Sequence, residues 1–327
     1  MAKLRAFSEE EKETARRIST MELLSRRYGF TFKPKGRGFS CKEHDSLIIS
    51  PDQRGWHWNS RGISGGDAIS FLQKIENMSY PEALQEIIGN GISYAQAPKT
   101  EIKQKEKKPF ELPEKFEGQY KRLFAYLCKT RGIDSSIISD LVRTEQLYED
   151  EHHNAVFVGF DIDGKPRSAV KRGTADSVKF RGEVEGSDKH YTFSMLRSQS
   201  TKLYVFESPI ECMSHATMVN KLKADPFAYY NQNRVSLNGL SDLGLAQLLE
   251  DNPQFTEIHI CLNNDDKAIE NHGQIAARRI AEKFTAKGYK CVNHLPPYQQ
   301  NDWNDSLKVR LASEQSQQVQ TMPPPRR

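Results

Sequence analysis

Acidic and amide side chains stand at the ends of several apolar segments in the second half of the chain. KLYVFE ends at Glu207, and EIHICLN ends at Asn263, with Asp265 two residues later. The segment KCVNHL is followed by NDWND, which contains Asp302. Carboxylates gathered in one place repel one another unless a cation lies among them, and Mg²⁺ prefers oxygen ligands. The residues therefore predict a site for a hard divalent ion, Mg²⁺ or Mn²⁺, and favour phosphoryl-transfer chemistry.

The elements around these residues explain how they can meet. Apolar segments alternate with segments of helical pattern at 209–221, 240–249 and 270–287. This alternation is typical of a parallel sheet with crossover helices. Because the carboxyl ends of parallel strands lie along one edge of the sheet, where ligands bind, we expect the site at that edge.

Each acid also has a simpler interpretation as a solvated loop residue or a helix cap. Glu211 stands one turn after Glu207, where it can serve as a further metal ligand or can favour the positive end of its own helix. We treat Glu207, Asp265 and Asn263 as candidate catalytic residues. The candidate metal ligands are these three residues together with Glu211 and Asp302.

A basic segment precedes the alternating region. AVFVGFDIDGKPRSAVKRG predicts a hairpin with Asp163 and Gly164 at its turn. Basic side chains crowd this hairpin and the residues after it, with Phe180 and Tyr191 among them; they are Lys171, Arg172, Lys179, Arg181 and Lys189. Cations that neutralise phosphates beside rings that stack on bases indicate single-stranded DNA binding. The alternative is a charged outer face of a sheet.

The N-terminal segment contains half of a zinc-ligand pattern. Cys41 and His44 have ligand spacing, but GWHWNSRG, which follows them, contains no cysteine. A structural zinc site needs four nitrogen or sulfur ligands, and recruiting His57 still leaves the set one short, so zinc is not expected. Trp56 and Trp58 either pack in the core or stack on bases, and core packing is favoured.

Three resemblances follow from these motifs. VFESPIECMSHA, VSLNGL, ICLNNDDKAIENHG and NDWND resemble the Toprim domain of bacterial primases, topoisomerases and some nucleases, in which a strand-end Glu and an Asp-x-Asp pair bind magnesium. The preceding RLFAYLCKTRGIDSSIISDL and the hairpin are similar to the segment before Toprim in primases, and most closely to the LtrC-like group of mobile elements. The N-terminal segment resembles a degenerate primase zinc ribbon.

These resemblances imply an α/β fold with a Rossmann-like parallel Toprim sheet, preceded by a primase-like α+β domain. The expected parts are a zinc-ribbon-like domain (1–94), a linker (95–116), a DNA-binding domain (117–199), a Toprim domain (200–312) and a disordered tail (313–327).

The implied function is that of a primase-like protein of a plasmid, phage or conjugative element, with single-stranded DNA, nucleotides and replication or conjugation proteins as partners. Glu207 matches the family glutamate and Asp265 the second aspartate, whereas Asn263 replaces the first aspartate. An amide brings no negative charge to a metal and cannot act as a base, which puts catalysis in doubt. The rival functions are a non-catalytic DNA-binding accessory factor and a Toprim nuclease.

Bulk composition fits these expectations. Residues 1–110 contain 19 Lys and Arg against 14 Asp and Glu, which suits a polyanion partner or a solvated surface. No apolar run approaches the length of a membrane span, and the N-terminus is too charged for a signal peptide, so we expect a cytoplasmic protein. The five widely spaced cysteines indicate reduced thiols.

Overall fold

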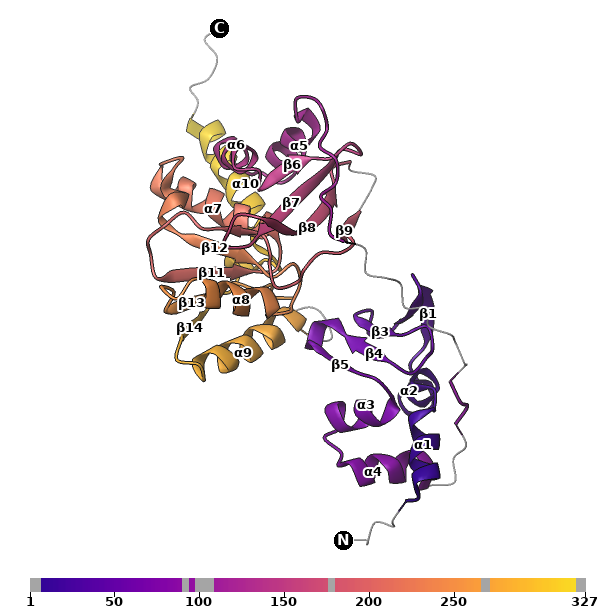
Figure 1. The fold of residues 1–327 in the computed structure, drawn as a ribbon. Helices are drawn as coiled ribbons and strands as arrows, with labels where there is room; N and C mark the ends of the chain where they lie inside the picture. Colours follow the sequence, from indigo (N-terminus) through magenta and orange to yellow (C-terminus); the bar gives the residue numbers. More distant parts are fainter. Residues whose placement is uncertain (1–6, 90–93, 98–108, 176–179, 266–270, 322–327) are drawn as a thin grey trace. The chain divides into compact units, whose positions relative to one another are not determined.

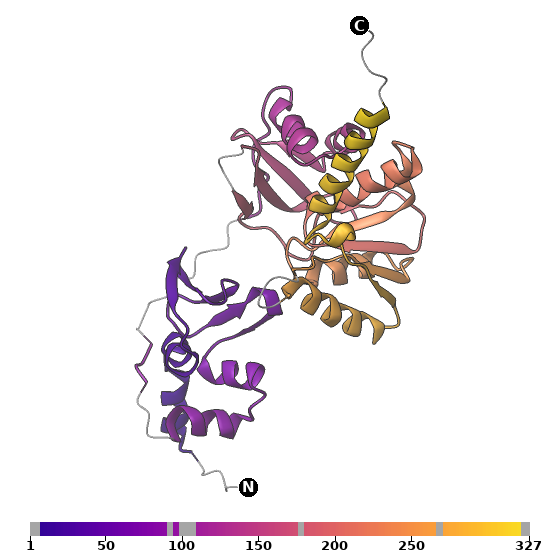
Figure 2. The same cartoon turned by 180° about the vertical axis from the view of Figure 1, so that it is seen from behind.

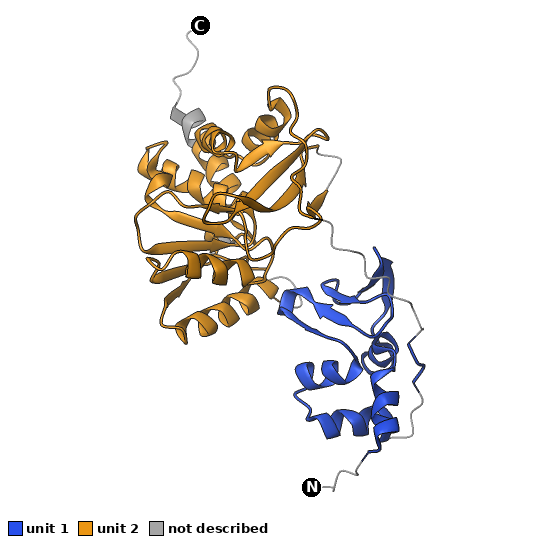
Figure 3. Ribbon diagram, viewed as in Figure 1, with its two compact units in different colours: residues 1–105 blue, residues 106–327 orange. Residues whose placement is uncertain are grey.

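The structure is a computed structural model that describes residues 7–89, 94–97, 109–175, 180–265 and 271–321. The chain divides into two compact units, residues 1–105 and residues 106–327 (Figure 3). None of the described helices is long and apolar enough to cross a membrane.

Unit 1 is built on an antiparallel five-stranded sheet in the order β1-β2-β3-β4-β5. Its strands are β1 (Phe32–Lys35), β2 (Gly38–Cys41), β3 (Leu47–Ile49), β4 (Trp56–Trp58) and β5 (Ile63–Gly65). Its helices are α1 (Glu9–Arg16), α2 (Thr20–Tyr28), η1 (Asn59–Arg61), α3 (Ala68–Ile75), α4 (Tyr80–Leu84) and η2 (Gln85–Gly89). Trp56 and Trp58 are buried in the core of this unit, so the prediction that they pack in the core is confirmed.

Unit 2 begins with helices and a four-stranded antiparallel sheet in the order β6-β7-β8-β9. The helices are α5 (Lys121–Ala125), η3 (Tyr126–Thr130) and α6 (Ser135–Arg143), and the strands are β6 (Leu147–Glu149), β7 (Asn154–Phe160), β8 (Pro166–Gly173) and β9 (Arg181–Glu183). The predicted hairpin is confirmed, because β7 pairs antiparallel with β8 and Gly164 at the turn has a φ of 76°.

The second sheet of unit 2 has the order β10-β12-β11-β13-β14. Its strands are β10 (Ser194–Met195), β11 (Lys202–Phe206), β12 (Asn233–Ser236), β13 (Glu257–Ile260) and β14 (Lys290–Asn293), and its helices are α7 (Pro209–Lys223), η4 (Ala228–Asn231), α8 (Leu243–Asp251), α9 (His272–Thr285), η5 (Pro297–Gln299) and α10 (Trp303–Thr321). β11, β12, β13 and β14 pair in parallel, and β10 adds an antiparallel edge. The predicted α/β class with a parallel sheet is confirmed.

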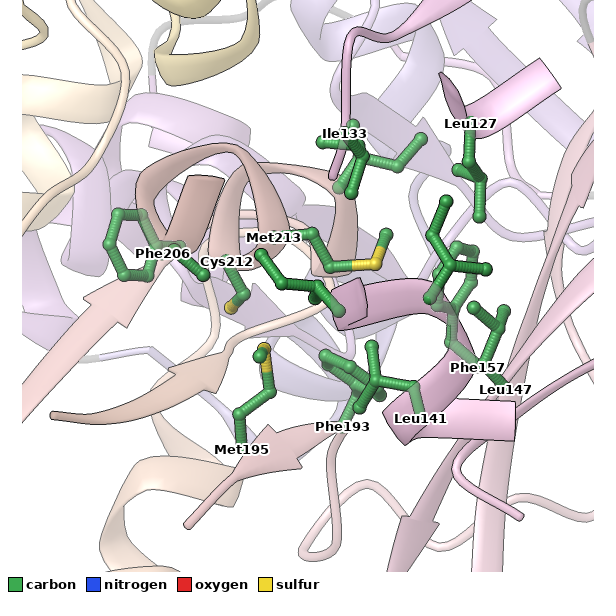
Figure 4. Packing of buried hydrophobic residues seen from close by; sticks show 14 of the residues in the cluster. Leu127, Ile133, Leu141, Leu147, Phe157, Phe193, Met195, Phe206, Cys212 and Met213 are labelled. Carbon is green, nitrogen blue, oxygen red and sulfur yellow. The ribbon is translucent and has the colours of Figure 1, made fainter. Parts of the chain in front are cut away.

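Helices cover both faces of this sheet (Figures 1 and 2). Val205, Val235 and Ile260 occupy matched positions on neighbouring strands and pack in one cluster with residues of α8 and α9. Phe206 faces the other side, where it packs with Cys212 and Met213 of α7 (Figure 4). Burial on both faces explains why β11 is a continuous apolar run after Lys202.

The last helix corrects one prediction. The tail from residue 313 was expected to be disordered, but α10 continues to Thr321. Leu307 is buried and Leu311 packs beside it, so the first turns of the helix are anchored. Glu and Gln residues then propagate a helix that is already nucleated, because propagation costs much less than nucleation.

Candidate functional site

Glu207 directly follows β11 at the carboxyl edge of the parallel sheet. Its backbone carbonyl accepts a hydrogen bond from the backbone N–H of Gly239, 3.0 Å away in the loop after β12. The pKa of Glu207 is raised to about 7, chiefly by burial; the charge of Arg181 lowers it, and the negative charges of Asp265 and Asp302 contribute to the rise. Glu207 therefore lies within electrostatic range of carboxylates from two other segments of the chain.

Glu211 lies in the first turn of α7 and is buried. Its Oε1 accepts a hydrogen bond of 2.7 Å from Ser208 Oγ, whereas its Oε2 is buried and has no hydrogen-bond partner among the described residues. Burial, and then the charges of Glu207 and Asp302, raise the pKa of Glu211 well above its ordinary value. The carboxyl thus retains an oxygen for a proton or a cation.

Asn263 and Asp265 lie in the loop between β13 and α9. The backbone carbonyl of Asn263 accepts a hydrogen bond of 3.0 Å from Gln274 Nε2. A Cβ added at Gly273 would stand only 2.2 Å from that carbonyl oxygen. The side-chain oxygen of Asn263 is buried without a hydrogen-bond partner in the described part of the chain. The N-terminus of α9 therefore holds this loop by close contact.

Asp302 immediately precedes α10. Its Oδ1 accepts a hydrogen bond of 2.7 Å from the backbone N–H of Asp305. The interpretation of Asp302 as a helix cap is therefore correct for one of its oxygens. The backbone N–H of Asn264 donates 2.8 Å to the Asn301 carbonyl, which ties this loop to the loop after β13. The strand-end loops thus bring Asp302 into the same electrostatic neighbourhood as Glu207 and Glu211.

The predicted DNA-binding residues divide into two groups. Arg172 of β8 and Arg181 of β9 are direct cross-strand partners, and within the described ranges the side chain of neither forms a hydrogen bond or an ion pair. Lys171 Nζ instead lies 3.8 Å from an Asp150 oxygen and 5.8 Å from the Phe180 ring centre.

Lys189 Nζ lies 3.9 Å from a Glu183 oxygen in a solvated pair. Lys179 lies outside the described residues. Among the predicted DNA-binding residues that the structure describes, the two arginines are therefore without an ion-pair partner, and the charge of Arg181 acts on Glu207.

The donor set suits a cation that brings its own water. Among residues 7–89, 94–97, 109–175, 180–265 and 271–321, no three His, Cys, Asp or Glu side chains converge closely enough to hold a metal by themselves. Mg²⁺ normally takes one or two protein carboxylates and fills its octahedron with water and phosphate oxygens. The unpartnered oxygens of Glu211 and Asn263 and the raised pKa of Glu207 fit such an ion.

Sequence reasoning missed the contribution of polar residues on the sheet face behind the acids. His259 of β13 bonds to His294 after β14, and Arg234 of β12 bonds to His215 of α7. Their signal was the alternation of polar with apolar residues inside EIHI and NRVS. That alternation marks a sheet face that is polar despite being covered.

Family comparison covers most of unit 2. Residues 204–307 match the family described as Toprim-like. The chain therefore carries a Toprim-like domain. This domain contains all five candidate metal ligands, and residues 125–200 before it match a family described as a protein of unknown function, DUF3991.

Individual relatives extend over the whole chain. An uncharacterized protein of Bacillus anthracis is 25% identical over 338 residues, which cover 97% of this chain and 94% of the relative. The zinc-binding and RNA polymerase domains of the Aquifex aeolicus primase align with 96% of this chain and 86% of their own, at 16% identity and a TM-score of 0.37. A DnaG primase catalytic domain bound to single-stranded DNA aligns with 61% of this chain and 63% of its own, at 13% identity and a TM-score of 0.36.

Proposed function

We propose that the protein is a primase-like Toprim protein of a plasmid, phage or conjugative element that binds single-stranded DNA and synthesises primers by Mg²⁺-dependent nucleotidyl transfer. The observation that carries this proposal is the effect of the charges of Asp265 and Asp302 on Glu207, since the three residues come from separate segments of the Toprim-like domain. Such a cluster is costly without a cation, and Toprim domains are sites of Mg²⁺ chemistry.

Each residue of the cluster has a distinct role in this proposal. Glu207 and Asp265 would hold Mg²⁺ or Mn²⁺, with Asp302 beside them and with Glu211 and Asn263 offering neutral or protonated oxygens. A divalent ion bound there supplies charge neutralisation for phosphate oxygens and activates a hydroxyl.

The basic strands supply the contact with the template. Arg172 and Arg181 stand opposite each other on β8 and β9, and the charge of Arg181 reaches Glu207. Unpaired guanidinium groups bind phosphates strongly because their fork of donors matches phosphate oxygens. We propose that they hold the DNA backbone beside the carboxylates, together with Lys171, Lys179 and Lys189.

A second candidate function is that of a DNA-binding accessory factor in conjugation or replication. Asn263 favours it, because an amide at this position removes one negative charge from the metal site. The basic strands would then bind DNA without chemistry.

Primer synthesis on single-stranded DNA with ribonucleotides and Mg²⁺ or Mn²⁺ tests these proposals. Synthesis by the parent chain that is lost in Glu207→Gln supports the enzyme. Synthesis only in Asn263→Asp indicates an impaired site, and binding without synthesis in all three chains supports the accessory factor. Cleavage of the template would instead identify a Toprim nuclease.

The N-terminal unit is proposed to function without zinc. The buried Cys41 thiol lies 3.3 Å from a Glu43 oxygen, and burial raises its pKa to about 11, whereas a zinc ligand must be a thiolate. Metal analysis of the purified protein tests this proposal, since one tightly bound zinc per chain would refute it. We also propose a cytoplasmic location and the five-part division into residues 1–94, 95–116, 117–199, 200–312 and 313–327, with the last part helical as far as Thr321.

A further inference from the structure

Arg131 and Asn304 join the two family segments of unit 2. Arg131 follows η3 within the segment 125–200, and Asn304 lies in the first turn of α10, within the Toprim-like domain. Arg131 Nη1 donates a hydrogen bond of 3.2 Å to Asn304 Oδ1, and Asn304 Nδ2 donates one of 2.8 Å to the backbone carbonyl of Arg131. Because Asn304 is only 2% exposed, this contact lies inside the protein.

The amide of Asn304 is held in one orientation. Its Nδ2 also donates a hydrogen bond of 3.0 Å to Ser214 Oγ of α7, and that hydroxyl donates one of 2.7 Å to the Ile210 carbonyl. Because the Ser214 proton is used in this way, both groups beside Nδ2 can only accept, which excludes the flipped amide. Asn304 therefore attaches the start of α10 to α7 and to the turn after η3 at once.

Arg131 is itself fixed in place. Its Nε donates a hydrogen bond of 3.0 Å to the Tyr126 hydroxyl, and its guanidinium carbon lies 5.3 Å from the centre of the Tyr126 ring. The next residue, Gly132, has a φ of 74°, and a Cβ there would stand 2.6 Å from Leu311 Cδ1 of α10. Ile133 then enters the buried core (Figure 4). The turn after η3 is thus packed closely against α10.

The first turn of α10 begins at Asp302. Asp302 Oδ1 accepts a hydrogen bond of 2.7 Å from the backbone N–H of Asp305, and the Asp302 carbonyl accepts one of 3.1 Å from the backbone N–H of Ser306. Asp302 is therefore bonded to the same helical turn that Asn304 attaches to the rest of unit 2. A displacement of this turn would move the Asp302 carboxylate away from Glu207, on which its charge now acts.

We propose that Arg131 and Asn304 are positioning residues for the candidate metal site, because their contact fixes the start of α10 and with it the carboxylate of Asp302. Neither residue touches the metal or the substrate in this proposal. The contact gives the segment 125–200 a role in the metal site besides DNA binding. Only the consequence for metal binding rests on the proposed function.

Hydrogen–deuterium exchange of the full chain tests the contact without metal or activity. Arg131→Met removes the guanidinium donors and keeps the apolar part of the side chain. We expect the backbone amides of Asp305 and Ser306, which donate to Asp302, to exchange about 10-fold faster in this variant than in the parent. Exchange of these amides at the parent rate would overturn the proposal.

Arg197→Met is the matched control, because it removes another partly buried arginine of unit 2. The side chain of Arg197 donates hydrogen bonds to residues 140–146 and to the Leu196 carbonyl, and to no residue of α10. The two amides of α10 are expected to exchange at the parent rate in this control. Equal acceleration in Arg197→Met and Arg131→Met would indicate a general loosening of unit 2 and would overturn the proposal.

Asn304→Leu removes the other partner of the contact with a side chain of similar size. We expect it to accelerate the same amides, and the double variant with Arg131→Met to exchange no faster than Asn304→Leu alone, because the two residues act through one contact. Independent, additive effects would contradict this. If Asn304→Leu fails to fold, the partly exposed Arg131 still carries the exchange and metal tests.

Mn²⁺ binding followed by electron paramagnetic resonance tests the consequence at the candidate site. We expect Arg131→Met to weaken Mn²⁺ binding about 10-fold, since residues that orient metal ligands typically have effects of this size, and Arg197→Met to bind as the parent does. Equal binding by Arg131→Met and the parent would overturn the positioning role. If the parent binds no Mn²⁺ while the exchange rates change as expected, the proposed metal site is refuted and the fixing of α10 by this contact is supported.

Discussion

Two buried oxygens without a hydrogen-bond donor distinguish the candidate site from an ordinary group of loop acids. Glu211 Oε2 and Asn263 Oδ1 have no partner in the described part of the chain, and an unsatisfied buried polar atom costs about 1–3 kcal/mol. By contrast, one oxygen of Asp302 is satisfied as a helix cap. At the scale of single residues, the site therefore contains buried oxygen atoms without a hydrogen-bond partner, which a cation or a proton would stabilise.

Glu207→Gln is expected to stabilise the metal-free protein in alkaline solution. The folded-state pKa of Glu207 is raised from 4.5 to about 7, so its favourable contribution is fully present below the unfolded value and is lost as the pH rises through about 7. Glutamine removes that loss. Urea unfolding with chelator present should show the variant about 2 kcal/mol more stable than the parent at about pH 8, and similar to it near pH 4.5.

The matched control is Glu282→Gln. It changes an exposed acid on α9 that forms no ion pair with the described residues. It is expected to leave the free energy of unfolding within about 0.5 kcal/mol of the parent. Added Mg²⁺ should stabilise the parent and the control but not Glu207→Gln. Equal stability of parent and Glu207→Gln at both pH values would contradict the raised pKa of this carboxyl.

The position of α9 determines where the loop after β13 runs. Asn271 caps the helix, because its Oδ1 accepts a hydrogen bond of 3.2 Å from the backbone N–H of Gln274. The same oxygen accepts a hydrogen bond from the backbone N–H of Asp265. Gly273 permits the first turn to approach the Asn263 carbonyl. At the scale of elements, a helix start and a strand end share one small contact that fixes both Asn263 and Asp265.

Gly273→Ala is expected to destabilise the protein although alanine favours helices. The added Cβ would stand 2.2 Å from a backbone oxygen, so α9 or the loop must move. Steric repulsion should outweigh the gain of about 1 kcal/mol in helix propensity and give a net loss of about 2 kcal/mol in urea unfolding. Metal-dependent stabilisation should fall as well, because the loop carries two candidate ligands.

Gly66→Ala serves as the comparison, since a Cβ at Gly66 meets no atom within 4 Å. Its free energy of unfolding is expected to stay close to that of the parent. If Gly273→Ala were as stable as Gly66→Ala, the close contact between α9 and the loop after β13 would not exist in solution.

The sequence predicts the presence of the parallel strands better than it predicts their surroundings. β11, β12, β13 and β14 are short segments that alternate with helices, and this alternation indicates parallel pairing. β10 consists of Ser194 and Met195 only, which is too short to leave a pattern, and its antiparallel pairing with β12 arises from tertiary structure. The continuation of α10 to Thr321 likewise depends on the burial of Leu307.

The candidate site divides in the same way. Glu207 is a candidate because it directly follows the apolar run of β11, whereas Asp302 follows β14 only after the segment 294–301 and Glu211 lies in α7. The hydrogen bond between His259 and His294 could not be predicted, because it depends on the register in which Ile260 pairs with Asn293, and no local pattern encodes that register. The unpaired state of Arg172 and Arg181 also appears only once β8 and β9 are aligned.

At the scale of the whole molecule, basic strands and an acidic strand-end cluster lie within one unit, so DNA affinity should depend on salt through a few defined cations. Arg172→Gln and Arg181→Gln should each weaken binding of single-stranded DNA at all sequences, because phosphate contacts carry no sequence information. Each should also reduce the magnitude of the slope of log K against log salt by about 0.7.

Fluorescence anisotropy with a labelled oligonucleotide over a series of salt concentrations measures these slopes. Lys223→Gln is the charge-matched control, because Lys223 is exposed at the end of α7, on a different element from the basic strands. If Lys223→Gln lowered the slope as much as Arg181→Gln does, DNA would be attracted by net charge alone. A smaller slope confined to the two arginine variants would indicate that DNA phosphates contact β8 and β9. Arg181 of β9 is also the residue whose charge acts on Glu207.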